Sequence, residues 1–201
     1  MKAYYHARAQ EYDDWWLQRG LYAPRSASGW VAERDRALAA VAALPPVRTL
    51  DVACGTGFVT RLLRGEVVGL DQSSAMLDAA REQAPDAELV VGDALELPFE
   101  DRSFDRVFTS HFYGHLEEPE RDRFLAEARR VASELVVFDA ALHGGEPRGE
   151  WQERVLNDGS RWQVYKRFFT GEGLAAELGG GCVLFAADWF VLVSSASETV
   201  S

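Results

Sequence analysis

Several features are scarce in this chain of 201 residues. It has two cysteines, Cys54 and Cys182, and neither lies in a CxxC or Cys/His cluster, so a disulfide framework is excluded and a metal site is not expected. No uncharged apolar run approaches the roughly 18 residues that a membrane helix needs. The first residues carry acids early and have no apolar core of signal-peptide length. We therefore expect a soluble, cytoplasmic protein without a membrane partner.

Basic charge is also scarce. The 21 Lys and Arg stand against 32 Asp and Glu, a net charge of −11, which repels polyphosphate and disfavours nucleic acid as a partner. Residues 1–50 carry 7 basic and 5 acidic side chains, so the acidic excess lies entirely in the later part. With 47% apolar residues, one domain can bury a full core.

The first 45 residues are typical of helices. Tyr5, Ala9, Tyr12 and Trp16 recur at spacings of four and three, which places a largely aromatic stripe on one helical face. A break follows, and a second helix is expected to end before Pro45. We expect residues 1–45 to form a helical lid on a core of residues 46–201.

From Val47 the pattern alternates between strand and helix. Strands are expected at 47–53, 66–71, 87–93, 105–110 and 134–140, with helices at 58–64, 74–83 and 118–132 between them. This alternation predicts an α/β, Rossmann-like, doubly wound and mostly parallel sheet. Residues 154–165 resemble a strand pair. Residues 182–195 are either a terminal hairpin or one long bent strand, so the sheet ends antiparallel and has seven strands if the tail supplies two.

The stretch LDVACGTGFVT, residues 50–60, carries the first chemical motif. A strand ends near Asp51, and a turn with Gly55 and Gly57 lets backbone approach a ligand and opens a helix with free N–H groups. Asp71 ends the next strand, where a carboxylate can accept both ribose hydroxyls of a nucleoside. Asp93 follows the third strand and can accept an adenine amino group. The pattern predicts a nucleoside site at the carboxyl edge of the sheet.

Alternatives remain for these residues. Each of the three acids can instead cap a neighbouring helix or turn. Thr60 stands where the dinucleotide fingerprint has its third Gly or Ala, which argues against a nicotinamide cofactor. Asp51 would crowd a pyrophosphate but suits an amine. We interpret Cys54 as a small packed residue and not a nucleophile.

Four stretches in order, LDVACGTGFVT, VVGLDQSSAMLDAA, VVGDALELPFEDRSFD and FLAEARRV, resemble the class I S-adenosylmethionine-dependent methyltransferases. The resemblance is to the small-molecule, quinone-biosynthesis-like branch, methyltransferase type 11, and the opening YYHARAQEYDDW resembles the helical lid of that branch. One departure is that VASELVV replaces the usual Gly-Gly turn after helix 118–132, which shortens that crossover.

The resemblance implies S-adenosyl-L-methionine as cofactor and S-adenosyl-L-homocysteine as product. The methionine part would be lined by Ala53, Cys54, Gly55 and Gly57, with Asp51 orienting its ammonium group. The nucleoside would be held by Asp71, Gln72, Met76, Gly92, Asp93, Ala94 and Leu95. Ser110 and His111 would lie beneath the methyl group.

Aromatic and basic residues outside these motifs are candidates for the acceptor site. Tyr12 and its aromatic neighbours either pack a helix or roof the cofactor. His111 and His115 either cap a loop or supply a general base. Further acceptor-binding candidates are Tyr5, Trp16, Tyr113, Tyr165 and Arg167. Glu117 and Glu120 are interpreted as a solvated helix start.

We therefore expect a methyltransferase, monomeric or homodimeric, that acts on a small apolar or aromatic acceptor. A non-catalytic S-adenosylmethionine-binding regulatory module and a nicotinamide-dependent oxidoreductase are the alternatives.

Overall fold

The computed structural model describes residues 2–25, 29–143 and 149–195. An N-terminal run of short helices leads into alternating strands and helices. The helices are α1 (Lys2–Arg8), α2 (Asp14–Leu17), α3 (Trp30–Ala42), α4 (Ser74–Gln83), α5 (Glu118–Val131) and α6 (Gly171–Glu177). The strands are β1 (Thr49–Val52), β2 (Val67–Asp71), β3 (Glu88–Val91), β4 (Phe104–Ser110), β5 (Ala132–Ala140), β6 (Gly149–Val155), β7 (Arg161–Arg167), β8 (Gly181–Ala186) and β9 (Phe190–Ser195).

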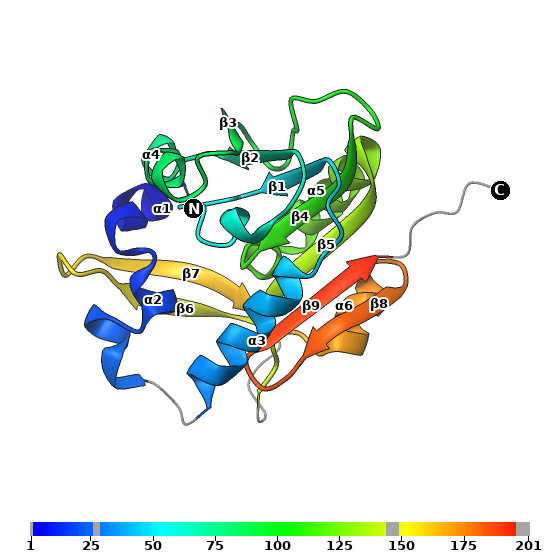
Figure 1. Ribbon diagram of the computed structural model, residues 1–201. Helices are drawn as coiled ribbons and strands as arrows, with labels where there is room; N and C mark the ends of the chain where they lie inside the picture. The colour runs from blue at the N-terminus through cyan, green and yellow to red at the C-terminus, as the bar shows by residue number, and fades with distance from the viewer. Residues whose placement is uncertain (1, 26–28, 144–148, 196–201) are drawn as a thin grey trace.

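Seven strands form one twisted sheet in the order β3-β2-β1-β4-β5-β9-β8 (Figure 1). The first five pair in parallel, and β9 pairs antiparallel with both β5 and β8. The order reverses at β1, because the chain adds β2 and β3 on one side and β4 on the other. This confirms the mostly parallel sheet with a terminal antiparallel hairpin.

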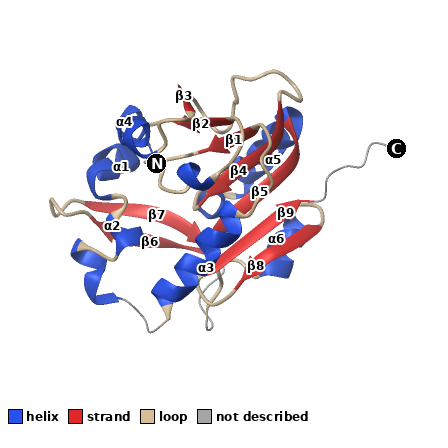
Figure 2. Cartoon of the chain, viewed as in Figure 1, coloured by secondary structure: helices blue, strands red, loops and turns tan. Residues whose placement is uncertain are grey.

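Helices cover both faces of the sheet, as Figure 2 shows. On one face α5 and α6 pack apolar side chains such as Phe124 and Leu174 against the strands. On the other face α3 and α2 pack Val41 and Trp16 against Phe108, Phe138 and other buried residues. Strand residues are buried on both faces of the sheet, for example Leu50 on one and Phe108 on the other, which gives the continuous apolar runs that a parallel sheet requires.

The N-terminal segment is helical as expected, but it is not one helix. Besides α1 and α2 it contains two 3-10 helices, Ala9–Glu11 and Gly20–Arg25, and α2 ends at Gln18, which has a left-handed backbone. The break is fixed by Asp13, whose carboxylate accepts hydrogen bonds from Thr56 Oγ1 and Gln83 Nε2, both at 2.6 Å. The expected stripe therefore separates, and Trp16 turns into the core while Tyr5 and Tyr12 do not.

The expected helix over residues 58–64 is wrong. Only a 3-10 helix, Thr60–Leu62, forms there. The chain must turn back quickly to β2 at Gly65, whose backbone φ is +98° and which lies so close to Val47 that no side chain would fit. In addition Thr60 Oγ1 donates to Asp51 at 2.7 Å, which anchors this segment to β1.

A second, two-stranded sheet of β6 and β7 lies beside the N-terminal helices (Figure 1). This pair confirms the expected turn over residues 154–165, although the strands extend beyond it. Tyr4 of α1 packs against Leu156 and Val164 of this hairpin. We call residues 2–25 together with the hairpin 149–167 the cover, because both lie over the same edge of the large sheet. The shortened crossover is confirmed too, since β5 begins directly where α5 ends.

Candidate functional site

A cavity of about 340 Å³ lies where the strand order reverses, between the carboxyl ends of β1, β2 and β4 and the cover. Open α/β sheets bind ligands at such a point, and this volume lies in the range of small-molecule sites. Its wall consists of Tyr5, Tyr12, Ala53, Gly55, Asp71, Gln72, Met76, Asp93, Ala94, Leu95, Ser110, His111, Phe112, His115, Leu116, Glu117, Glu120, Trp151 and Tyr165.

The turn after β1 brings backbone to this cavity. Ala53 and Gly55 have positive φ angles of 59° and 56°, and a side chain at Gly55 would point towards the Tyr12 ring. Gly57 does not line the cavity. A Cβ there would lie 3.2 Å from the Cα of Ala80, so this glycine is required by packing on α4.

Asp71, at the end of β2, fixes this turn. Its carboxylate accepts the backbone N–H of Gly55 at 3.0 Å and that of Ser73 at 2.8 Å. Burial raises its pKa above the ordinary value for aspartate. Ser73 in turn caps α4 by accepting the N–H of Met76. Asp71 was expected either to bind a ligand or to cap a neighbouring turn or helix. Its carboxylate makes these capping hydrogen bonds, and the residue also lines the cavity.

Asp51 lies deeper, on β1. One carboxylate oxygen accepts the Thr60 hydroxyl, and the other is buried without a partner among the described residues. Burial and, more weakly, the neighbouring Asp71 charge raise the pKa of Asp51 to about 7, against the hydrogen bond from Thr60, which lowers it. Asp51 and Cys54 line a small side cavity that shares Tyr12, Ala53 and Ser110 with the large one. Burial also raises the pKa of the Cys54 thiol, in keeping with a packed residue.

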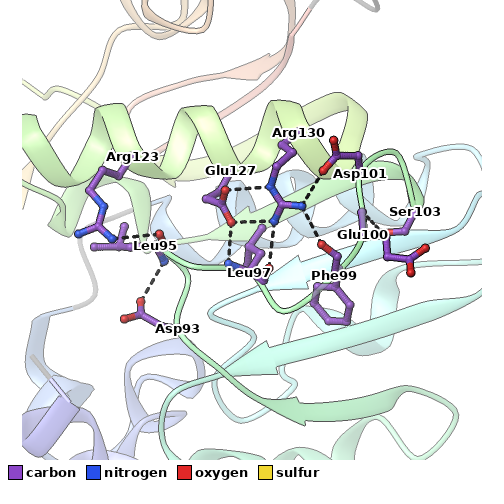
Figure 3. A network of polar contacts seen from close by, with 10 residues as sticks. All are labelled: Asp93, Leu95, Leu97, Phe99, Glu100, Asp101, Ser103, Arg123, Glu127 and Arg130. Carbon is purple, nitrogen blue, oxygen red and sulfur yellow. Dashed lines mark hydrogen bonds and ion pairs between the residues drawn. The ribbon is translucent and has the colours of Figure 1, made fainter.

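Asp93 opens the loop that follows β3, and Figure 3 shows how this loop is held. The Asp93 carboxylate accepts the N–H of Leu95 at 2.9 Å. Further along, Arg130 of α5 donates to the carbonyls of Leu97 and Phe99 while its guanidinium pairs with Glu127 and Asp101. Gly92 does not line the cavity. Its place is dictated by Leu70, because a Cβ at Gly92 would lie 2.7 Å from a Leu70 methyl.

His111 follows β4 with a strained, positive φ of 52°. Its ring lies among Trp15, Trp16, Phe138 and Phe190, with ring centres 5.0–5.9 Å away. Nδ1 lies 3.7 Å from Asp139, and Nε2 is buried without a partner among the described residues. Burial lowers the pKa of His111 to about 3, so its ring is neutral.

His115 lies in a short 3-10 helix, Tyr113–His115, and lines the cavity. Its Nδ1 lies 2.6 Å from the carbonyl oxygen of Tyr165. Burial, and then the charge of Lys166, lower its pKa well below the ordinary value for histidine.

Of the expected acceptor residues, only Tyr5 and Tyr165 line the cavity. Trp16 is 2% exposed and stacks on Phe58 in the core. Tyr113 is fully buried and donates its hydroxyl to Glu177, which also pairs with Arg167. None of these three lines the large cavity, although Trp16 borders the small side cavity. Arg167 lies on the same face of β7 as Tyr165, but two residues further along its guanidinium pairs with Glu177 of α6 instead of lining the cavity.

Five wall residues were not expected in this role: Phe112, Leu116, Glu117, Glu120 and Trp151. Glu117 and Glu120 do begin α5 as expected, and the Glu120 carboxylate accepts the N–H of Glu117, but they also border the cavity. Trp151 is 59% exposed at the edge of the cavity. For Trp151 the sequence offers one signal of a binding role, because this tryptophan stands in a stretch that is otherwise rich in polar residues.

Two further observations concern the described part of the chain. No cluster of three or more His, Cys, Asp or Glu residues there has the geometry to hold a metal ion. None of the helices in those ranges combines the length and apolar character needed to cross a bilayer.

Comparison with known proteins agrees with this geometry. A family model for a methyltransferase domain matches residues 50–135. Over 103 residues the chain is 43% identical to demethylmenaquinone methyltransferase of Thermotoga maritima, and over 106 residues it is 42% identical to that of Renibacterium salmoninarum. These matches cover 49% and 50% of this chain and 44% of each relative, so the similarity spans less than half the length of these relatives.

Similarity of structure extends over nearly the whole chain. A solved DhpI–SAM–HEP complex has a TM-score of 0.73 at 27% identity, covering 96% of this chain and 94% of the other. A DhpI–SAH complex has a TM-score of 0.70 at 26% identity, covering 98% and 95%. Residues 50–135 thus match the methyltransferase-domain family, and nearly the whole chain is similar in fold to the DhpI–SAM–HEP and DhpI–SAH complexes.

Proposed function

We propose that the chain binds S-adenosylmethionine in the 340 Å³ cavity and transfers a methyl group to a small apolar or aromatic acceptor. One observation carries this proposal. Asp51 lies in β1, Asp71 ends β2 and Asp93 follows β3. These three strands are neighbours, and the three acids surround one end of the cavity or its side extension. Three carboxylates placed in this order suit a cationic nucleoside better than a phosphate.

The residues present fit such a ligand. The unpaired, buried oxygen of Asp51 needs a donor, and an ammonium group entering the side cavity would supply it. Asp71 keeps lone pairs for ribose hydroxyls, since each of its oxygens accepts one backbone N–H. Gln72 and Met76 from the start of α4, with the backbone of Ala94 and Leu95, form the walls for adenine.

The proposed ligand supplies an electrophilic methyl group on a sulfonium centre. What the protein must add is position and a dry environment. Tyr12 and His111 enclose the cavity between the Gly55 turn and the end of β4, beside Ser110. The cover, residues 2–25 with the β6–β7 hairpin, acts as the lid.

The acceptor side of the cavity is lined by Tyr5, Phe112, Trp151 and Tyr165. Their aromatic surfaces favour a flat, apolar or aromatic molecule. The relatives named demethylmenaquinone methyltransferase and the solved complex that contains SAM and HEP are consistent with small-molecule acceptors.

Calorimetry with S-adenosylhomocysteine tests the cofactor site. We expect binding to the wild type and at least a ~100-fold weaker Kd in Asp71→Asn, because charged hydrogen bonds contribute about 1.5–3 kcal/mol each. Asp122→Asn, a change at an exposed acid of α5, is the matched control and should bind like the wild type. No heat at millimolar ligand with folded wild-type protein would overturn the proposal.

A nicotinamide cofactor is disfavoured by Thr60, which occupies the third glycine position and uses its hydroxyl on Asp51. A thermal-shift screen should show stabilisation by S-adenosylhomocysteine and none by NAD(H) or NADP(H).

A further inference from the structure

His115 is the one wall residue whose protonated nitrogen can be assigned from its contact. A carbonyl oxygen only accepts hydrogen bonds, so the 2.6 Å contact with Tyr165 requires a proton on Nδ1 of His115. The other ring nitrogen, Nε2, then carries a lone pair. Because His115 lines the cavity next to Tyr5 and Tyr165, a hydrogen-bond acceptor is available on the acceptor side.

A buried ion pair holds this segment in place. Lys166 of β7 donates to Asp139 of β5, and both side chains are almost completely buried. The same carboxylate accepts the N–H of Gly114 at 2.8 Å, the residue before His115. A Cβ at Gly114 would lie only 3.0 Å from Lys166 Nζ. The pair therefore clamps residues 111–115 between the large sheet and the cover.

The surroundings of His115 keep its ring neutral. Lys166 on β7 and Arg154 on β6 oppose a positive charge there, Asp139 on β5 favours one, and Tyr5 of α1 packs edge-on against the ring. His111 is also neutral, with Asp139, Lys166 and Arg8 as its charged neighbours, but its Nε2 is buried among aromatic rings. His115 is thus the better placed of the two to receive a proton from a ligand.

We propose, resting on the function proposed above, that His115 Nε2 accepts the proton of a hydroxylated aromatic acceptor during methyl transfer, and that Lys166 and Asp139 are its positioning residues. The acceptor class follows from the aromatic wall, where Trp151 and Tyr165 lie 5.7 Å apart between ring centres, together with a neutral proton acceptor among them.

The proposed step balances. A lone pair of the acceptor oxygen forms the new O–CH₃ bond, the S–CH₃ bond breaks and its electron pair stays on sulfur. The hydroxyl proton moves to His115 Nε2 and leaves to water when the cover opens. A weak base suffices, because an oxygen that is gaining a methyl group becomes strongly acidic. A base with a lowered pKa also returns its proton readily to water.

The first test is spectroscopic and needs no acceptor. In the S-adenosylhomocysteine complex, ¹⁵N NMR should show His115 neutral and protonated at Nδ1 from pH 8 to about 5.5. Lys166→Met should raise its titration midpoint by at least about one pH unit, whereas Lys166→Arg keeps the charge and should leave the midpoint low. A proton on Nε2, or an ordinary midpoint near 6.5 in the wild type, would overturn the proposal even if Lys166→Met does not fold.

The second test measures methyl transfer from labelled S-adenosylmethionine to phenol, catechol and 1,4-dihydroxynaphthalene, with their methyl ethers as aprotic controls. We expect transfer to hydroxylated rings only, and at least a ~100-fold lower kcat in His115→Gln with an unchanged S-adenosylhomocysteine Kd. His143→Gln is the matched control and should keep wild-type kcat. Cofactor binding without transfer to any of these phenols would overturn the acceptor class, whereas absent cofactor binding would instead count against the proposed function.

Discussion

The two sides of the cavity are built differently. On the sheet side, Asp51 and Asp71 are placed by strands whose neighbouring residues are completely buried and whose backbones are paired on both edges. On the cover side, contacts between individual side chains hold the chain. Arg8 lies among Tyr4, Tyr12 and Tyr22, and it donates hydrogen bonds to the first and last of them.

We call the sheet side of the cavity, formed by β1, β2 and β4 and the turns that follow them, the floor. This difference implies that the floor is fixed, whereas the cover can open. Among the described side chains of residues 2–25, those that are buried belong to Tyr4, Ala9 and Trp16. A segment with few buried side chains opens at a lower free energy than global unfolding requires. We infer that a change in the floor alters the stability of the whole domain, while a change in the cover alters its opening alone. Three substitutions test this division.

Phe124→Ala should have the largest effect, because it removes a fully buried ring of α5 that packs on Phe112 and Tyr113. We expect the free energy of unfolding to fall by about 3–5 kcal/mol in urea denaturation. The cover should unfold in the same transition. A loss below about 1 kcal/mol, or a separate transition for the sheet, would contradict a single cooperative floor.

The protonation of Asp51 should set the pH dependence of cofactor binding. Its pKa is about 7 in the free protein, and a bound ammonium group would require the ionised carboxylate. We therefore expect S-adenosylhomocysteine affinity to fall about tenfold per pH unit below pH 7, with proton release detected by calorimetry in buffers of different ionisation heat. Asp51→Asn should bind weakly with a flat pH profile; the same slope in that variant would show that another group titrates.

The pH dependence of folding stability is opposite to that of cofactor binding. Because the folded pKa of Asp51 lies above its unfolded value, the free protein is stabilised at low pH, and this contribution is lost as the pH rises through 7. Ligand binding should thus offset a destabilisation that is greatest at neutral and higher pH.

Arg8→Met should have the smallest of the three effects and should act on the cover. It keeps the apolar stem but removes two hydrogen bonds and the stacking of the guanidinium 4.9 Å from the Tyr12 ring centre. We expect amide exchange in residues 3–17 to accelerate about tenfold, equivalent to about 1.4 kcal/mol, with little change in Tm.

Arg161→Met is the matched control for Arg8→Met. Arg161 is also in the cover, but its side chain is 67% exposed and pairs only with the partly exposed Glu153, so exchange should change less than twofold. Equal acceleration in both variants would mean that loss of any arginine loosens the cover, and the role of Arg8 would be refuted.

The floor was largely predictable because its determinants are local in sequence. Apolar runs ending in Asp51 and Asp71, each followed by a turn, indicated strands that end at one edge of a sheet. The cover was less predictable. The contact of Lys166 with Asp139 joins two sheets, and nothing near either residue indicates the other. The helix predicted over residues 58–64 does not form. A helical apolar pattern does not reveal that Thr60 is hydrogen-bonded to Asp51 or that Gly65 packs directly against Val47.

The anchoring of the loop after β3 has a kinetic consequence. Arg130 of α5 joins that loop to the helix through the carbonyls of Leu97 and Phe99 and the carboxylate of Asp101, and Glu127 of α5 accepts the N–H of Leu97 (Figure 3). This side of the cavity is therefore formed before any ligand binds. We therefore expect ligand exchange to depend on the cover, so that under the proposed function the product would leave when residues 2–25 and the β6–β7 hairpin separate from the sheet. Under the proposed function, the turnover rate would then report the opening of the cover, because the methyl transfer itself would be faster than that step.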